Sequence, residues 1–206
     1  MSSDPRELGE RSEPPDSRRL IAALGGASER VYEPGAEVVS QLDHALQCAD
    51  LAESAGADEE LVLAALLHDV GRFAADPALI ADRTRAAAPA AGARGHHDVG
   101  ADLIAPWVTA RTAWCVRMHA DAKRYLCATD ASYHARLSPA SQRTLVMQGG
   151  VMTPDEVAAF AEHPWAADAV ALRRWDDQAK VAGKPVTSLA ERGALIRRWF
   201  DRPPRA

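Results

Sequence analysis

The chain has 206 residues, a formal net charge of −5 and a hydrophobic content of 47%, which suits one domain with a sizeable core. The acidic balance argues against a nucleic-acid partner, because nucleic-acid-binding proteins usually show a net basic footprint. No stretch approaches the ~18 consecutive apolar residues of a membrane-spanning helix, so we expect no membrane partner either.

In chain order, residues 1–25 are expected to form a flexible tail, because the stretch 1–19 is polar, charged and contains prolines. Apolar residues at helical spacing then predict a single all-α domain over 26–201, and 202–206 form a short C-terminal tail. Proline and glycine residues separate the predicted helices. These helices cover residues 38–55, 59–74, 97–109, 111–127, 139–148, 153–162, 165–181 and 187–200.

The strongest functional candidates stand at the end of one apolar helix. Residues 61–70 read LVLAALLHDV, a run that ends in His68 and Asp69 and is followed by Gly71. Such runs are buried, and a buried imidazole beside a buried carboxylate is costly unless each finds a partner or a cation. A metal ion satisfies both groups. Because adjacent helical residues point about 100° apart, we interpret Asp69 as a bridge whose two oxygens serve two ions.

Other histidines and a second aspartate complete a two-metal site. His44 and Asp176, together with His68, give one ion three terminal ligands besides the bridge. His97 and His119 give the other ion only two, so positions stay open for substrate or water, as in a catalytic site. Imidazole and carboxylate ligands suit iron, manganese or zinc, and the ligand types alone do not identify which of these metals is bound.

Taken alone, each of these residues has a plainer explanation. A single histidine on an apolar helix is more often a hydrogen-bonded core residue than a metal ligand, and only the combination predicts a metal centre. His97 has His96 as its neighbour, and Asp176 has Asp177. In each pair the other side chain remains an alternative ligand.

The order of His44, the doublet 68–69 and Asp176 resembles the H...HD...D signature of the HD-domain superfamily, an all-helical metal-binding fold whose members are mostly phosphohydrolases. Other segments resemble its oxygenase branch, the mixed-valent diiron enzymes typified by 2-amino-1-hydroxyethylphosphonate dioxygenase. These segments are SQLDHALQCADLAE from Ser40, MHADAKRYLCA from Met118 and YHARLSPASQRTLVMQGG from Tyr133. The likeness runs from about residue 32 to residue 180.

The resemblance implies a helical bundle with a dinuclear site in its core, two iron ions in the Fe2+/Fe3+ state and O2 as co-substrate. The metal ligands that it implies are His44, His68, Asp69, His97, His119 and Asp176. The catalytic residues would be Asp69, His97, His119 and Lys123. The substrate contacts would be Tyr32, Glu37, Gln41, Arg72, Lys123, Ser141 and Thr144, with the lysine and the last two hydroxyls holding the phosphonate.

The chain departs from the family pattern at two places. Arg72 stands after Gly71 where the family commonly has histidine, and arginine offers a permanent charge with bidentate donors. In the lid before the first ligand helix, Glu37 keeps its spacing to His44, but Tyr32 lies two residues further away than expected. In the family, the glutamate at this position recognises the amino group of the substrate. Glu37 therefore implies a cationic substrate, while the longer lid leaves the size and methylation of the amine open.

From these features we expect a cytoplasmic enzyme that uses O2 to oxidise a small organophosphonate and cleave its C–P bond. The expected substrate is 2-amino-1-hydroxyethylphosphonate or an N-methylated analogue, and the products are phosphate and a carboxylic acid such as glycine. The alternatives are an HD-type metal-dependent phosphohydrolase and a non-enzymatic metal-stabilised sensor domain. The location follows from three cysteines without CxxC spacing. We expect a monomer or a homodimer.

Overall fold

The structure is a computed structural model in which residues 16–32, 39–73 and 95–203 are described. These residues form ten α-helices and two short 3-10 helices, and an isolated antiparallel bridge joins Val31 to Ser40. The expected all-α class is confirmed. None of the described helices is both long enough and apolar enough to cross a membrane.

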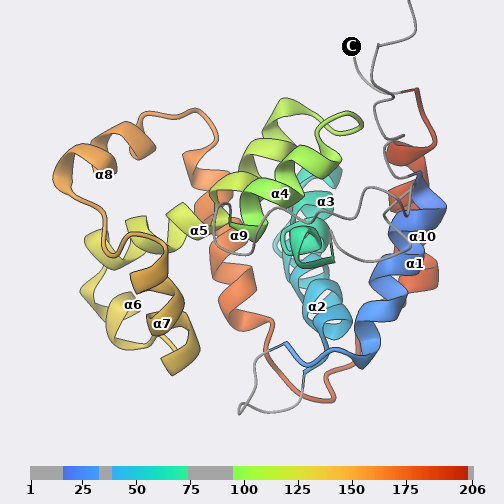
Figure 1. Ribbon diagram of the computed structural model, residues 1–206, viewed down its shortest axis with the longest axis horizontal. Helices are drawn as coiled ribbons and strands as arrows, with labels where there is room; N and C mark the ends of the chain where they lie inside the picture. The colour runs from blue at the N-terminus through green and yellow to red at the C-terminus, as the bar shows by residue number, and fades with distance from the viewer. Residues whose placement is uncertain (1–15, 33–38, 74–94, 204–206) are drawn as a thin grey trace, which may run out of the picture.

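Four helices form the centre of the bundle: α2 (Gln41–Ser54), α3 (Glu59–Leu67), α5 (Ala110–Thr129) and α9 (Ala166–Gln178). Helix α5 packs against α9 and α3, and α2 packs against α3 and α9 (Figure 1). All residues of α3 from 61 to 67 are buried, as expected of a helix that is apolar on every side. The centre of the fold is therefore the apolar run that the sequence singles out.

Side-chain caps explain why these helices begin where they do. Ser40, Asp58 and Thr109 each accept a hydrogen bond from a backbone N–H group in the first turn of α2, α3 and α5. Such caps satisfy donors that the helix itself leaves unpaired. Helix α3 ends at Leu67, and the 3-10 helix η2 (Val70–Phe73) follows. The predicted single helix over 59–74 is thus interrupted at residues 68 and 69.

The outer helices lie on two sides of this centre. Helix α4 (His96–Ile104) packs against α5 and η2. Helices α6 (Ala131–Ala135), α7 (Pro139–Met147) and α8 (Pro154–Ala161) lie at one end of the molecule, opposite α1 (Ser17–Gly26) and α10 (Leu189–Phe200) (Figure 1). Helix α6 was not predicted, because five residues are too few to show a helical period.

The N-terminal boundary differs from the sequence-based expectation. Residues Ser17–Gly26 form helix α1, which packs against α10 (Leu189–Phe200), although the expected tail extended to residue 25. The reason is a short apolar face at i and i+4 spacing: Leu20 and Leu24 are fully buried. The polar residues before them obscured this face in the sequence. Residues 1–15 lie outside the described part of the chain.

We predict that Leu24→Ala lowers the free energy of unfolding by about 2–5 kcal/mol, because it leaves a cavity between α1 and the core. Chemical denaturation followed by circular dichroism measures the change. The matched control is Arg18→Ala, on the exposed side of the same helix, where the expected change is about 0.5 kcal/mol or less. Equal effects of the two substitutions would show that α1 does not stabilise the domain.

Candidate metal centre

Two buried imidazoles face each other where α2 and α3 meet. His44 Nε2 lies 3.1 Å from His68 Nε2. The Nδ1 atoms lie 2.7 Å from the Ala179 carbonyl oxygen for His44 and 2.8 Å from that of Ala65 for His68. A carbonyl oxygen only accepts, so each Nδ1 carries the proton and each Nε2 presents a lone pair. Two lone pairs that face each other in a buried space call for a cation between them.

Asp176 on α9 joins this first cluster. Its Oδ1 lies 3.3 Å from His44 Nε2 and 3.9 Å from His68 Nε2. Burial alone would raise the pKa of Asp176, but the Arg173 guanidinium, 2.7 Å from Oδ2, holds that pKa well below its usual value. Tyr32 donates a hydrogen bond to Oδ1 over 3.1 Å. Asp176 is therefore an anion at neutral pH, as a metal ligand must be.

One cysteine stands beside the same cluster. Cys48 lies one turn after His44 on α2, and its sulfur is 3.8 Å from His44 Nε2. Burial, followed by the charges of Asp176 and Asp69, raises the pKa of this thiol well above its usual value. Cys48, His44 and His68 also form a group that could hold a metal ion, and a bound cation would favour the thiolate form of the cysteine.

Asp69 connects the first cluster to a second one. Its Oδ2 lies 3.7 Å from His68 Nε2, and its Oδ1 lies 2.9 Å from His96 Nε2 and 3.9 Å from His119 Nε2. Burial would raise the pKa of Asp69, but the Arg72 guanidinium is the main cause that holds it well below the usual value. The two oxygens of one ionised carboxylate thus face two different groups of imidazoles.

The second cluster consists of Asp69, His96 and His119. The Nε2 atoms of the two histidines are 3.2 Å apart, and His119 Nδ1 lies 2.7 Å from the Val116 carbonyl oxygen. His119 Nε2 is therefore the unprotonated nitrogen and points toward the cluster. Burial, then the nearby His68 and His96, lowers the pKa of His119 well below its usual value. The neutral imidazole is the form that binds metals.

His97 does not take the place that the sequence analysis gave it. Its Nε2 is 3.7 Å from Asp98 Oδ2, whereas His96 makes the contacts to Asp69 and His119. Helix α4 begins at His96, and neighbouring helical residues point about 100° apart. Only one of the two adjacent histidines can therefore face the cluster.

Gly71 and Gly100 lie where η2 meets α4. A Cβ added at Gly71 would lie 1.9 Å from the His96 carbonyl oxygen and 2.7 Å from the Gly100 nitrogen, so η2 and α4 approach closely only because position 71 is glycine. Gly100 is four residues after His96 and shares its helix face.

The second cluster opens into a small pocket of about 50 Å³. Lys123 is buried there and donates a hydrogen bond to Thr144 Oγ1 over 2.7 Å. Burial, with a smaller effect of Arg173, lowers the pKa of Lys123 to about 8. The pocket brings together five of the predicted substrate contacts, namely Tyr32, Arg72, Lys123, Ser141 and Thr144.

The remaining predicted contacts lie elsewhere. Glu37 is outside the described residues. Gln41 is the first residue of α2 and does not line the pocket, although its Oε1 is buried without a hydrogen bond from the described residues. Gln148 lines the pocket and has the same kind of unpaired Oε1. Sequence reasoning assigned no site role to Gln148.

Arg173 is the functional residue that sequence reasoning missed. It is buried, and besides Asp176 it contacts Asp177, which also accepts a 2.6 Å hydrogen bond from the Tyr133 hydroxyl. Arg173 Nε is 3.1 Å from that hydroxyl oxygen. The signal was its spacing of three and four residues from two aspartates, which places all three on one helix face.

The unpaired lone pairs and the ionised carboxylates fit two cations. Three of the Nε2 atoms have their Nδ1 protons fixed by backbone carbonyls. In addition, Asp69 Oδ2 is buried without a hydrogen bond of acceptable geometry, although Arg72 Nε lies 2.8 Å away. Buried acceptors are rarely left in this state without a partner. The donor set of nitrogen and oxygen atoms suits a transition metal.

Comparison with known proteins places this arrangement in a family. Residues 42–147 match the HD domain family. The chain is 44% identical to the hydroxymethylphosphonate dioxygenase of Gimesia maris over 155 residues, 75% of each protein. It is 35% identical over 186 residues to the 1-hydroxy-2-(trimethylamino)ethylphosphonate dioxygenase (glycine-betaine-forming) of Leisingera caerulea, covering 89% of this chain and 91% of that protein. An uncharacterized mimivirus protein, L432 of Acanthamoeba polyphaga mimivirus, is 31% identical over 74% of this chain and 68% of its own length.

The structure predicts different metal contents for two neighbouring variants. His96→Ala removes one of three groups in the second cluster, so we expect it to retain about one metal equivalent less per chain than the unaltered protein. His97→Ala is the matched control and should retain the full content. Elemental analysis after iron loading and desalting measures both. Loss of metal in His97→Ala with none in His96→Ala would contradict the geometry.

Proposed function

This chain belongs to the HD-domain family, and we propose that it is a diiron dioxygenase that cleaves the carbon–phosphorus bond of a 1-hydroxyalkylphosphonate. The observation that carries the proposal is one carboxylate, Asp69, shared by two clusters, with a buried lysine in the pocket beside the second cluster. Two relatives at 44% and 35% identity are named as dioxygenases of hydroxylated phosphonates.

We assign the two ions to the two clusters. His44, His68 and Asp176 would be the terminal ligands of the first ion, and Asp69 would bridge both. The second ion would take His96 and His119 as its remaining ligands, in place of the pairing with His97. Iron at these positions would supply the redox chemistry that O2 needs, with the second ion acidifying the substrate hydroxyl.

Residues around the second cluster are suited to bind the substrate. Lys123 lies one helical turn after His119, and its ammonium group already meets the Thr144 hydroxyl. A phosphonate beside the second ion would accept charge-assisted hydrogen bonds from Lys123 and hydrogen bonds from Ser141 and Thr144. Arg72 is paired with Asp69, so it offsets the charge of the bridging carboxylate and adds a second cation to the same pocket.

The products follow from oxidation at C1. The carbon leaves as a carboxylic acid and the phosphorus as phosphate, which consumes one O2 per substrate. We propose 2-amino-1-hydroxyethylphosphonate or an N-methylated analogue as substrate, with glycine or the methylated glycine as product. Hydroxymethylphosphonate, the substrate named for the Gimesia maris relative, would give formate by the same reaction and is the alternative.

The first functional test compares phosphate release with and without O2. Iron-loaded protein is given hydroxymethylphosphonate, 2-amino-1-hydroxyethylphosphonate, its N-trimethyl analogue and a generic phosphate ester. We expect release from at least one hydroxyphosphonate only when O2 is present, and none after His96→Ala or His119→Ala. Release from the ester without O2 would instead support the HD-type phosphohydrolase, which the same ligands permit.

The lysine predicts a specific pH dependence. Because burial lowers the pKa of Lys123 to about 8, its charge is present below pH 8 and is lost as the pH rises above it. We expect kcat/KM to be limited by this group in the alkaline range and to fall up to about tenfold per pH unit above pH 8, while a bound phosphonate keeps the lysine charged and shifts the fall in kcat to higher pH. Lys123→Arg keeps a permanent charge and should abolish the alkaline fall. An unchanged alkaline fall in this variant would assign it to another group.

A further inference from the structure

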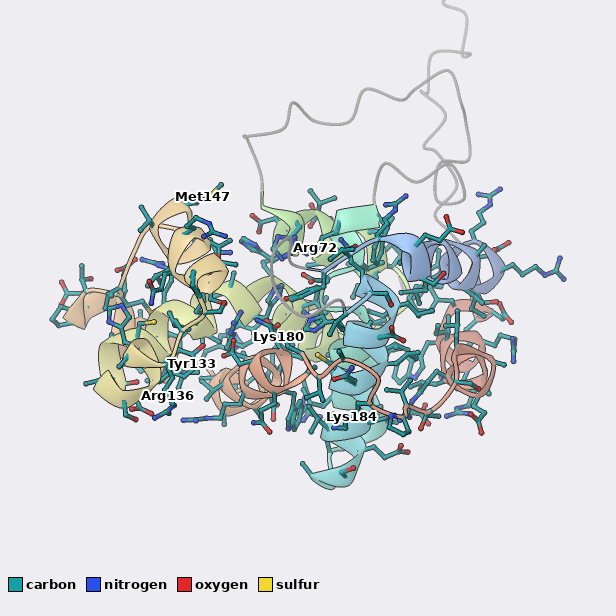
Figure 2. The ribbon with its side chains drawn as sticks, turned by 90° about the horizontal axis from the view of Figure 1, so that it is seen from below. Arg72, Tyr133, Arg136, Met147, Lys180 and Lys184 are labelled. Carbon is teal, nitrogen blue, oxygen red and sulfur yellow. The ribbon has the colours of Figure 1, made fainter. Side chains whose placement is uncertain are left out.

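A second pocket of about 290 Å³ lies next to the pocket of the metal centre. Ser141 on α7 lines both pockets. The second pocket is formed by α6, the start of α7 and the end of α9. Figure 2 labels three of its lining residues: Tyr133 on α6, Arg136 just after α6, and Lys180 just beyond α9. Its volume is near the lower end of the range for small-molecule sites.

The charged lining of this second pocket is mostly basic. Arg136, Arg174 and Lys180 contribute three cations, and Asp177 contributes one carboxylate. That carboxylate is already held by the buried Arg173 and by the Tyr133 hydroxyl, and its Oδ1 lies 3.9 Å from Lys180 Nζ. An anion in the pocket would therefore meet a net positive charge and little repulsion.

The inner wall of the pocket is apolar. Leu137 and the ring of Tyr133 are buried and line it. A bare inorganic anion would leave this wall without a partner. A ligand that carries an anionic head and a short apolar body would satisfy both parts of the lining.

We propose that this second pocket binds a small organophosphonate or organophosphate, with its anionic head against Arg136, Arg174 and Lys180 and its carbon chain against Leu137 and Tyr133. Phosphonate as the ligand in the cell rests on the proposed function, whereas the lining does not depend on it. Ser141 borders both pockets. A phosphonate in the second pocket would therefore be separated by this side chain from the pocket that contains Lys123 and the second metal cluster. The pocket thus holds substrate beside the site of reaction.

The probe for this site is n-propylphosphonate. It has a phosphonate head and an apolar chain, but it lacks the C1 hydroxyl through which a substrate would chelate the metal centre. Binding to the iron-loaded protein without O2 is measured by calorimetry, with inorganic phosphate as the comparison. We expect n-propylphosphonate to bind more tightly than phosphate, and added salt to weaken both, because the lining cations are partly exposed.

Matched variants locate the bound probe. Arg136→Gln and Arg174→Gln should each weaken binding about twofold to fivefold, as expected for exposed charges, and the double variant about tenfold. Arg143→Gln, an exposed arginine on α7 that does not line the pocket, should leave affinity unchanged. Lys123→Gln removes a cation from the catalytic pocket only, so the binding that requires Arg136 and Arg174 should persist in this variant.

Two results would overturn the proposal. The first is the absence of n-propylphosphonate binding to the unaltered protein at millimolar concentration. The second is binding that Lys123→Gln removes and that the double variant retains, which would place the probe at the metal centre alone. Failure of the proposed function is a separate outcome: no O2-dependent phosphate release from any hydroxyphosphonate, with probe binding that still requires Arg136 and Arg174.

Discussion

The buried carboxylate of Asp69 is the constraint on which the rest of the site depends. Its oxygens point to two groups of imidazoles, and each group lies on different helices. To place it there, α3 must stop at Leu67 and turn into η2, and Gly71 must allow α4 to approach. The end of α3, the close approach at Gly71 and the ion pair with Arg72 thus all help to position this carboxylate.

Burying so many ionisable groups in a helical bundle would be unfavourable without compensation. The two central carboxylates, Asp69 and Asp176, are each paired with an arginine, Arg72 and Arg173. These pairs keep both aspartates ionised, while burial keeps His68 and His119 neutral by lowering their pKa values. These candidate ligands therefore have the protonation states in which such side chains bind metals.

Two pockets with basic side chains lie near the metal centre. Lys123 and Arg72 make the small pocket beside the second cluster attractive to a phosphonate. Beyond Ser141, Asp177 and Tyr133 line the larger basic pocket, and both contact the buried Arg173. In the proposed function the first pocket holds the reacting phosphonate, and the second binds one before or after reaction.

The sequence by itself determined the helical class and most helix positions, because periodicity marks buried faces. It also predicted His44, His68, Asp69, His119 and Asp176 as candidate metal ligands, because buried ionisable groups need partners. It did not determine which of His96 and His97 faces Asp69, since that depends on the exact start of α4 and on its contact with Gly71. It also missed the burial of α1, the role of Arg173 and the second pocket. Each of these depends on contacts between helices far apart in the chain, and local periodicity carries no information about which distant surfaces meet.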